Sequence, residues 1–103
     1  MGSLIVGSGV AVPPRVVTND DLSKIMDTTD EWIVSRSGVR QRHVAEPGVG
    51  PSDLAAEAVT AALADAGVAA SEVDLLVTAT MTPDQFAPGI AGVVQDRSGL
   101  GHV

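Results

Sequence analysis

The sequence has no cysteine among its 103 residues. This absence excludes disulfide bonds, thiolate metal sites and a cysteine nucleophile within these residues, and it is compatible with a cytoplasmic location. Aromatic residues are also scarce, because Trp32 and Phe86 are the only two. Aliphatic and small side chains therefore have to build the interior. Small-residue helices packed against β-branched strands favour an α/β fold.

Positive charge is the second scarcity. Six Lys and Arg residues face 13 Asp and Glu residues, which gives a net charge of −7. Nucleic-acid binding draws its affinity from clustered cations, so this balance argues against a nucleic-acid partner.

Long uninterrupted apolar runs are also missing from the sequence. The opening MGSLIVGSGVAV has no basic leader and is interrupted by Gly and Ser, so we expect neither a signal peptide nor a membrane span.

Apolar patterning predicts an alternation of strands and helices. Runs rich in β-branched residues predict buried parallel strands at Ser3–Val6 and Val73–Thr80. Capping residues and terminal glycines predict helices over residues 19–26, 29–37, 52–66 and 90–98, with a short hairpin arm over 39–45. This order predicts a right-handed βαβ arrangement. Two strands do not complete a parallel sheet, so we expect these residues to be the front portion of a larger α/β enzyme.

The stretch DTTDEWIVSRSGVRQRH holds the single tryptophan and three of the six cations. Thr28 and Glu31 have the spacing of a capping box, which predicts a helix that starts at Thr29. Thr28, Trp32 and Arg36 then recur every four residues along one stripe of that helix.

Two interpretations of this stripe remain open on spacing alone. An indole and a guanidinium four residues apart suit an adenine ring and a phosphate, with Arg40 and Arg42 extending the positive field. The alternative is a Trp at the domain surface with Arg laid over it as a cation–π pair.

Other motifs favour structural over chemical roles. Gly7-Ser8-Gly9 lacks the third glycine of a dinucleotide-binding turn, and prolines at 13 and 14 block the required helix. We therefore interpret it as a bend in a buried strand and keep a Rossmann-type module only as an alternative. His43 and His102 have no metal-ligand spacing. No nucleophile motif or Ser-His-Asp set is present, so we expect no catalytic residue and no metal site within this chain.

Four blocks of the sequence carry a resemblance to a known family. These are GSGVAVPPRVVTNDDL, DTTDEWIVSRSGVRQRH, SDLAAEAVTAALADAG and VDLLVTATMTPDQFAPGIAGVVQ. Together they resemble the N-terminal third of β-ketoacyl-acyl carrier protein synthase III, of the thiolase-like superfamily. The resemblance implies a layered α-β-α-β-α fold with a mostly parallel or mixed sheet and covering helices. Residues 1–103 would then be the incomplete N-terminal portion of one ketosynthase domain.

The resemblance also implies an activity. Such an enzyme is a cytoplasmic homodimer that moves an acyl group from acyl-CoA to a cysteine and condenses it with malonyl-acyl carrier protein, losing carbon dioxide. It works in fatty acid or polyketide biosynthesis. Its partners are acyl-CoA and the acyl carrier protein, and acyl-CoA is a substrate and not a cofactor. The resemblance implies no nucleic-acid partner and no membrane partner. The family's catalytic Cys, His and Asn lie beyond the residues given.

Residue roles follow from the same resemblance. Trp32 is expected to stack on the adenine of coenzyme A, with Thr28, Arg36 and Ser37 beside the nucleotide. Ala87 occupies a position that reaches the partner's acyl pocket across the dimer, where many relatives carry a larger or hydroxylated residue. We therefore expect a roomier pocket and an acyl group longer than acetyl.

Two alternatives remain beside this expectation. One is an acyltransferase of secondary metabolism that keeps the fold without decarboxylative condensation. The other is a non-catalytic fragment that dimerises or binds coenzyme A. If it serves only to dimerise or to pair with another polypeptide, Trp32 would be an interface anchor.

Overall fold

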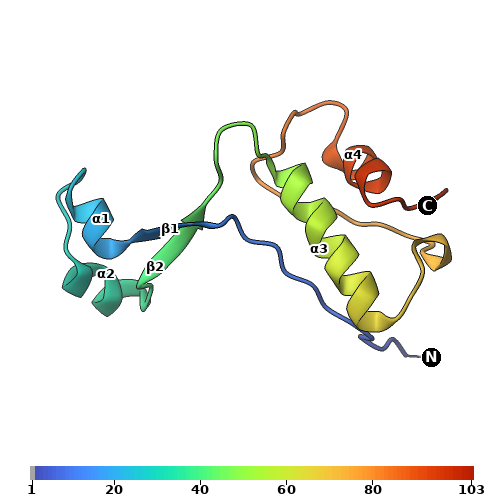
Figure 1. Cartoon of the computed structure of the whole chain (residues 1–103), viewed down its shortest axis with the longest axis horizontal. Helices are drawn as coiled ribbons and strands as arrows, with labels where there is room; N and C mark the ends of the chain where they lie inside the picture. The colour runs from blue at the N-terminus through green and yellow to red at the C-terminus, as the bar shows by residue number, and fades with distance from the viewer. Residues whose placement is uncertain (1) are drawn as a thin grey trace. The chain divides into compact units, whose positions relative to one another are not determined.

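The computed structural model describes residues 2–103. The chain forms two compact units, each described here by itself (Figure 1). The helical unit joins the segment up to Ala11 with Gly48–Val103, and the small unit comprises Val12–Pro47.

The small unit is a two-stranded antiparallel ribbon with two short helices. Strand β1 (Arg15–Thr18) pairs with β2 (Gln41–Val44), and helices α1 (Asn19–Ser23) and α2 (Asp30–Ser37) lie between them in sequence. The predicted hairpin arm over 39–45 is thus confirmed. Its partner β1 was not predicted, because the two prolines directly before it were expected to end the extended segment.

Helix α1 starts where the sequence predicts and ends earlier. The Thr18 hydroxyl accepts from the Asp21 N–H at 3.1 Å, and the Asp21 carboxylate accepts from the Thr18 N–H at 2.9 Å. This capping box fixes the first turn. The helix ends at Ser23 and not at Met26. Ile25 and Met26 are exposed, so no packing sustains a further turn.

The helical unit is built on α3 (Pro51–Ala66), followed by the 3₁₀ turn η1 (Ala70–Glu72) and α4 (Ile90–Arg97). Helices α3 and α4 pack together, and the buried apolar residues of the unit are Ala56, Ile90, Val94 and Leu100. The capping pattern that starts at Ser52 predicted the first residue of α3 one position too late. Gly50 is the N-cap and Pro51 opens the helix, which places Ser52 inside the first turn.

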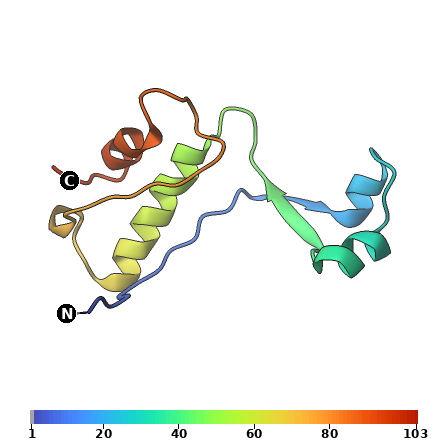
Figure 2. The same cartoon turned by 180° about the vertical axis from the view of Figure 1, so that it is seen from behind.

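Two extended segments, residues 3–10 and 73–80, run along α3 in both views (Figures 1 and 2). The prediction of paired strands at Ser3–Val6 and Val73–Thr80 is wrong, since β1 and β2 form the one sheet in residues 2–103. A strand needs ladder hydrogen bonds from a neighbour, and no described segment supplies them. Ile5 is 91% exposed and Val77 is 79% exposed, so these segments are not covered on both faces.

The glycines of Gly7-Ser8-Gly9 allow one of these segments to approach α3 closely. A Cβ at Gly9 would lie 2.3 Å from the Ala58 carbonyl oxygen and 2.4 Å from the Ala62 nitrogen. The Ser8 N–H donates to the Asp65 carboxylate at 3.0 Å. Helix α3 thus fills the space that a bound pyrophosphate would need, which supports a structural role over a dinucleotide-binding turn.

Candidate functional site

Helix α2 of the small unit carries the predicted contact stripe, and its cap differs from the prediction. Thr29 is the N-cap, and its hydroxyl accepts from the Trp32 N–H at 3.1 Å. The predicted capping box of Thr28 and Glu31 is therefore wrong by one residue. The Thr28 hydroxyl oxygen is buried and has no hydrogen-bond partner within the described residues. The predicted terminator is confirmed, because Gly38 adopts φ 74°.

Trp32 lies on the surface of the small unit with its side chain 55% exposed. The Arg36 guanidinium carbon lies 5.2 Å from the centre of the indole ring, within the range of a cation–π contact. The cation–π pair expected as one alternative is thus present. An exposed indole with a cation over it also keeps the two groups that a nucleotide requires, a flat apolar face and a positive charge.

An open hollow of about 320 Å³ adjoins the indole. It is lined by Asp27, Thr28, Thr29 and Trp32. The structure therefore brings Thr28 and Trp32 to one hollow, although Thr28 precedes the helix and does not belong to its stripe. Arg36 joins this group through its contact with the ring.

Ser37 is engaged in ending the helix. Its hydroxyl donates to the Ile33 carbonyl oxygen at 2.8 Å and accepts from the Val39 N–H at 3.2 Å. Arg42 is likewise structural, because it donates to the Val17 carbonyl oxygen at 3.2 Å and to the Asn19 side chain at 2.7 Å. These contacts leave Trp32, Arg36 and Thr28 as the group most available to a ligand.

Asn19 holds α2 in place and was missed by sequence reasoning. It is 1% exposed, and its amide nitrogen donates to the Asp30 carboxylate and to the Val39 carbonyl oxygen, each at 2.8 Å. Its amide oxygen accepts from Arg42. The Asn19 side chain therefore joins the first residue of α2 to Val39, which follows the helix, and to Arg42 of β2. No local pattern marks this role, because the partners lie 11 to 23 residues away.

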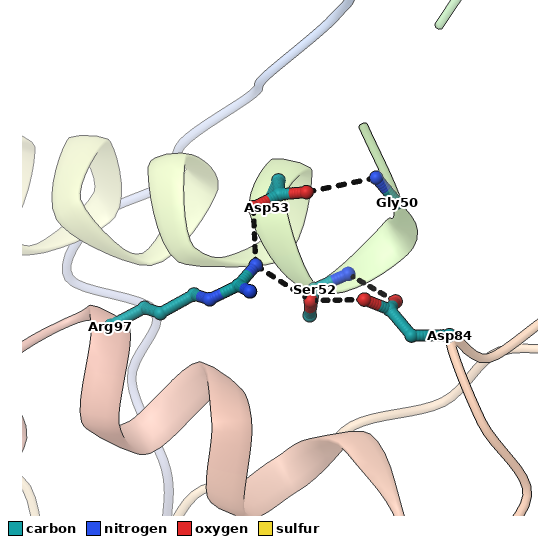
Figure 3. A network of polar contacts seen from close by, with 5 residues as sticks. All are labelled: Gly50, Ser52, Asp53, Asp84 and Arg97. Carbon is teal, nitrogen blue, oxygen red and sulfur yellow. Dashed lines mark hydrogen bonds and ion pairs between the residues drawn. The ribbon is translucent and has the colours of Figure 1, made fainter. Parts of the chain in front are cut away.

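The turn TMTPDQFAPG belongs to the helical unit and contains the remaining predicted site residue. Ala87 is exposed, and the neighbouring Phe86 is 94% exposed. Within the same turn, Asp84 accepts two hydrogen bonds from Ser52 at the start of α3, and Arg97 of α4 bonds to Ser52 and Asp53 (Figure 3). Hydrogen bonds from the Ser52 side chain and backbone lower the pKa of the Asp84 carboxyl. Sequence reasoning named the turn and missed this anchor.

Known proteins resemble this chain in sequence and in fold. No protein-family profile matches it. A β-ketoacyl-[acyl-carrier-protein] synthase III from Rhodospirillum centenum is 56% identical over 98 residues, which are 95% of this chain and 30% of that protein. The crystal structure of 3-oxoacyl-[acyl-carrier-protein] synthase III from Aquifex aeolicus superposes with a TM-score of 0.92 at 39% identity, over 99% of this chain and 33% of that one. The chain matches about one third, the N-terminal part, of proteins named β-ketoacyl-[acyl-carrier-protein] synthase III.

The synthase III likeness extends to a polyketide enzyme. The priming β-ketosynthase of the R1128 polyketide pathway matches with a TM-score of 0.87 at 34% identity, over 93% of this chain and 29% of that one. These likenesses confirm the predicted family and the thiolase-like α/β fold. The chain spans about 30% of the length of the synthase III relatives it matches.

Two negative findings concern the described residues alone. No group of three or more His, Cys, Asp or Glu residues within residues 2–103 is placed to hold a metal ion. None of the helices in this part of the chain combines the length and the hydrophobicity that crossing a bilayer requires.

Proposed function

We propose that these residues form one side of the coenzyme A entrance of a β-ketoacyl synthase III-type enzyme. The enzyme's cysteine thiolate, outside these residues, attacks the acyl-CoA thioester and expels the coenzyme A thiolate. Malonyl-acyl carrier protein then loses carbon dioxide, and the resulting carbanion attacks the acyl-enzyme thioester and releases the cysteine. We assign this enzyme to the cytoplasm as a homodimer of fatty acid or polyketide biosynthesis, with acyl-CoA as substrate and no separate cofactor.

The exposed Trp32 under Arg36 carries this proposal. Stacking of a purine on an indole buries apolar surface on both partners, and Trp32 is 55% exposed with Arg36 over its ring. Arg36 adds a permanent positive charge 5.2 Å from the ring centre, which suits the phosphates of the nucleotide. Thr28 lines the adjoining hollow with Trp32, and its buried hydroxyl oxygen has no hydrogen-bond partner within the described residues. Ser37 contributes by ending the helix that presents these groups.

Ala87 is assigned to the acyl pocket. A methyl side chain occupies less volume than the residues expected there in relatives, so the pocket accepts an acyl chain longer than acetyl. A strong preference of the enzyme for acetyl-CoA would contradict this assignment.

The test uses a full-length synthase that contains these 103 residues. We expect Trp32→Ala to raise the KM for acyl-CoA about tenfold or more, because loss of base–aromatic stacking costs roughly 1–3 kcal/mol. The KM for malonyl-acyl carrier protein should stay unchanged. Glu31→Gln is the matched control, since Glu31 is exposed and makes no side-chain hydrogen bond or ion pair within the described residues.

Two results would reject the coenzyme A role. The first is an acyl-CoA KM in Trp32→Ala equal to that of Glu31→Gln. The second is an unchanged KM together with a loss of dimer on sizing, which would instead make Trp32 an interface anchor.

A further inference from the structure

The start of α3 is completed by a carboxylate from a distant part of the helical unit. The Ser52 N–H donates to one oxygen of Asp84 at 2.9 Å, and the Ser52 hydroxyl donates to the other at 2.5 Å (Figure 3). Ser52 is fully buried, and the helix cap Gly50 has no side chain to bond the free N–H groups. Asp84 thus supplies the anionic partner that a helix N-terminus favours.

The opposite side of Ser52 is also engaged. The Ser52 hydroxyl accepts a hydrogen bond from Arg97 at 2.9 Å and donates its proton to Asp84. Its O–H donor and one of its two acceptor lone pairs are therefore both satisfied. Arg97 also forms an ion pair with Asp53, whose other oxygen accepts from the Gly50 N–H at 2.9 Å. The turn, the first turn of α3 and the last turn of α4 therefore meet at one hydroxyl.

Asp84 attaches the turn by hydrogen bonds, and the buried Ile90 at the start of α4 holds its other end. Within the described residues, the two Ser52 bonds are the only hydrogen bonds that join residues 81–89 to α3 or α4. Phe86 stands two positions further on and is 94% exposed, so packing within the described residues does not hold it. The position of Phe86 and Ala87 therefore depends on the carboxylate that precedes them.

We propose that Asp84 is a positioning residue for acyl-chain selection. Held by Ser52, which Arg97 holds in turn, it fixes the turn so that Phe86 and Ala87 present a defined wall to the acyl chain. This proposal rests on the proposed function, because it takes Ala87 as part of the acyl pocket. It goes beyond that function by assigning the position of Phe86 and Ala87 to Asp84, a residue that does not touch the substrate.

Gly50 offers a way to disturb this anchor without removing a polar group. A Cβ at position 50 would lie 2.8 Å from an Asp84 carboxylate oxygen. Gly50 has φ −112°, so alanine fits the backbone conformation there. Gly50→Ala should therefore displace the carboxylate and leave the backbone of α3 intact.

The experiment measures kcat/KM for acyl-CoA substrates of two, four, six and eight carbons in the full-length synthase. We expect Asp84→Asn and Gly50→Ala to change the ratio between the best and the poorest chain length by about fivefold or more. Ser52→Ala should have a smaller effect, because the Ser52 N–H still bonds Asp84. Asp74→Asn is the matched control, since Asp74 is an exposed carboxylate of the same unit without a side-chain hydrogen bond or ion pair in the described residues.

The ratio of two kcat/KM values on one preparation does not depend on the amount of folded enzyme, so partial unfolding of a variant cannot imitate the effect. A ratio in Asp84→Asn and Gly50→Ala equal to that of Asp74→Asn would overturn the positioning role. Binding of coenzyme A, measured by calorimetry and weakened about tenfold or more by Trp32→Ala, reports separately on the proposed function. Retained binding with an unmoved ratio rejects this inference alone, and absent binding rejects the proposed function.

Discussion

Replacement of Asn19 by alanine should loosen α2 more than any other single polar change in the small unit. The substitution removes three side-chain hydrogen bonds, two of them to the charged partners Asp30 and Arg42 and one to the Val39 carbonyl oxygen. It leaves the backbone bond from the Asn19 N–H to the Arg40 carbonyl oxygen in place. The effect should therefore fall on the attachment of α2 and not on the strand pair.

The magnitude follows from the partners. Hydrogen bonds to charged groups contribute about 1.5–3 kcal/mol each and a neutral one about 1 kcal/mol. Asp30 is exposed and Arg42 half-buried, so water replaces part of what each loses. A net loss of roughly 3 kcal/mol remains, which corresponds to about a hundredfold change in the opening equilibrium of α2.

Amide hydrogen exchange in the full-length synthase measures this opening directly. The Ile33 and Gly38 N–H groups, which bond to Thr29 and Val34 within α2, should exchange about a hundredfold faster in Asn19→Ala. Asp20→Ala is the neighbouring control, because Asp20 is exposed and its carboxylate makes no hydrogen bond in the described residues. Exchange rates in Asn19→Ala within threefold of the Asp20→Ala rates would refute the reasoning.

Three further predictions concern caps, close packing and charge. Thr29→Ala should destabilise α2 by about 1 kcal/mol because it removes the cap, whereas Thr28→Val should cost nothing; urea titration distinguishes them, and equal losses would contradict the assignment of the cap. Gly9→Ala should lower the calorimetric unfolding temperature, because its Cβ would lie 2.3 Å from the Ala58 carbonyl oxygen, while Gly92→Ala, with no atom within 4 Å, should raise stability by about 0.5–1 kcal/mol. The pKa of Asp84 is lowered from 3.8 by its bonds to Ser52, so the stability it contributes is complete above that value and is lost as the pH falls through the lower pKa of the folded state; acid titration of Asp84→Asn should show a weaker loss than the unmodified protein, and parallel curves would contradict it.

Local signals in the sequence were sufficient for the ends of α2, α3 and α4, which glycines follow, but not for the end of α1. Gly38, Gly67 and Gly99 each follow a helix with φ between 66° and 74°, as their positions after apolar periodic segments predicted. The start of α2 is not fixed by the sequence, because Thr28 and Thr29 offer adjacent hydroxyls and local spacing does not choose between two registers one residue apart. The structure selects Thr29, and Thr28 becomes available for another role.

Long-range contacts could not be predicted in this way. The bonds of Asp84 to Ser52 cross 32 residues, and no spacing rule links a turn to a helix at that distance. The apolar runs at 3–6 and 73–80 predicted strands because strand propensity reflects composition, but a strand also requires a neighbour to pair with. Residue spacing predicted the stripe that contains Trp32, and the family resemblance suggested its ligand. No local sequence pattern indicated that Asn19 holds α2 in place.

The distance between Ser52 and Asp84 also has a consequence for biosynthesis. A ribosome delivers α3 well before it delivers the carboxylate that completes its first turn, since the two residues are 32 positions apart. Until then the Ser52 amide and hydroxyl are served by water. The first turn of α3 is therefore completed late, only after the extended segment 73–80 and Asp84 have been synthesised. Bringing Asp84 back to Ser52 also carries the entropic cost of closing the loop between them.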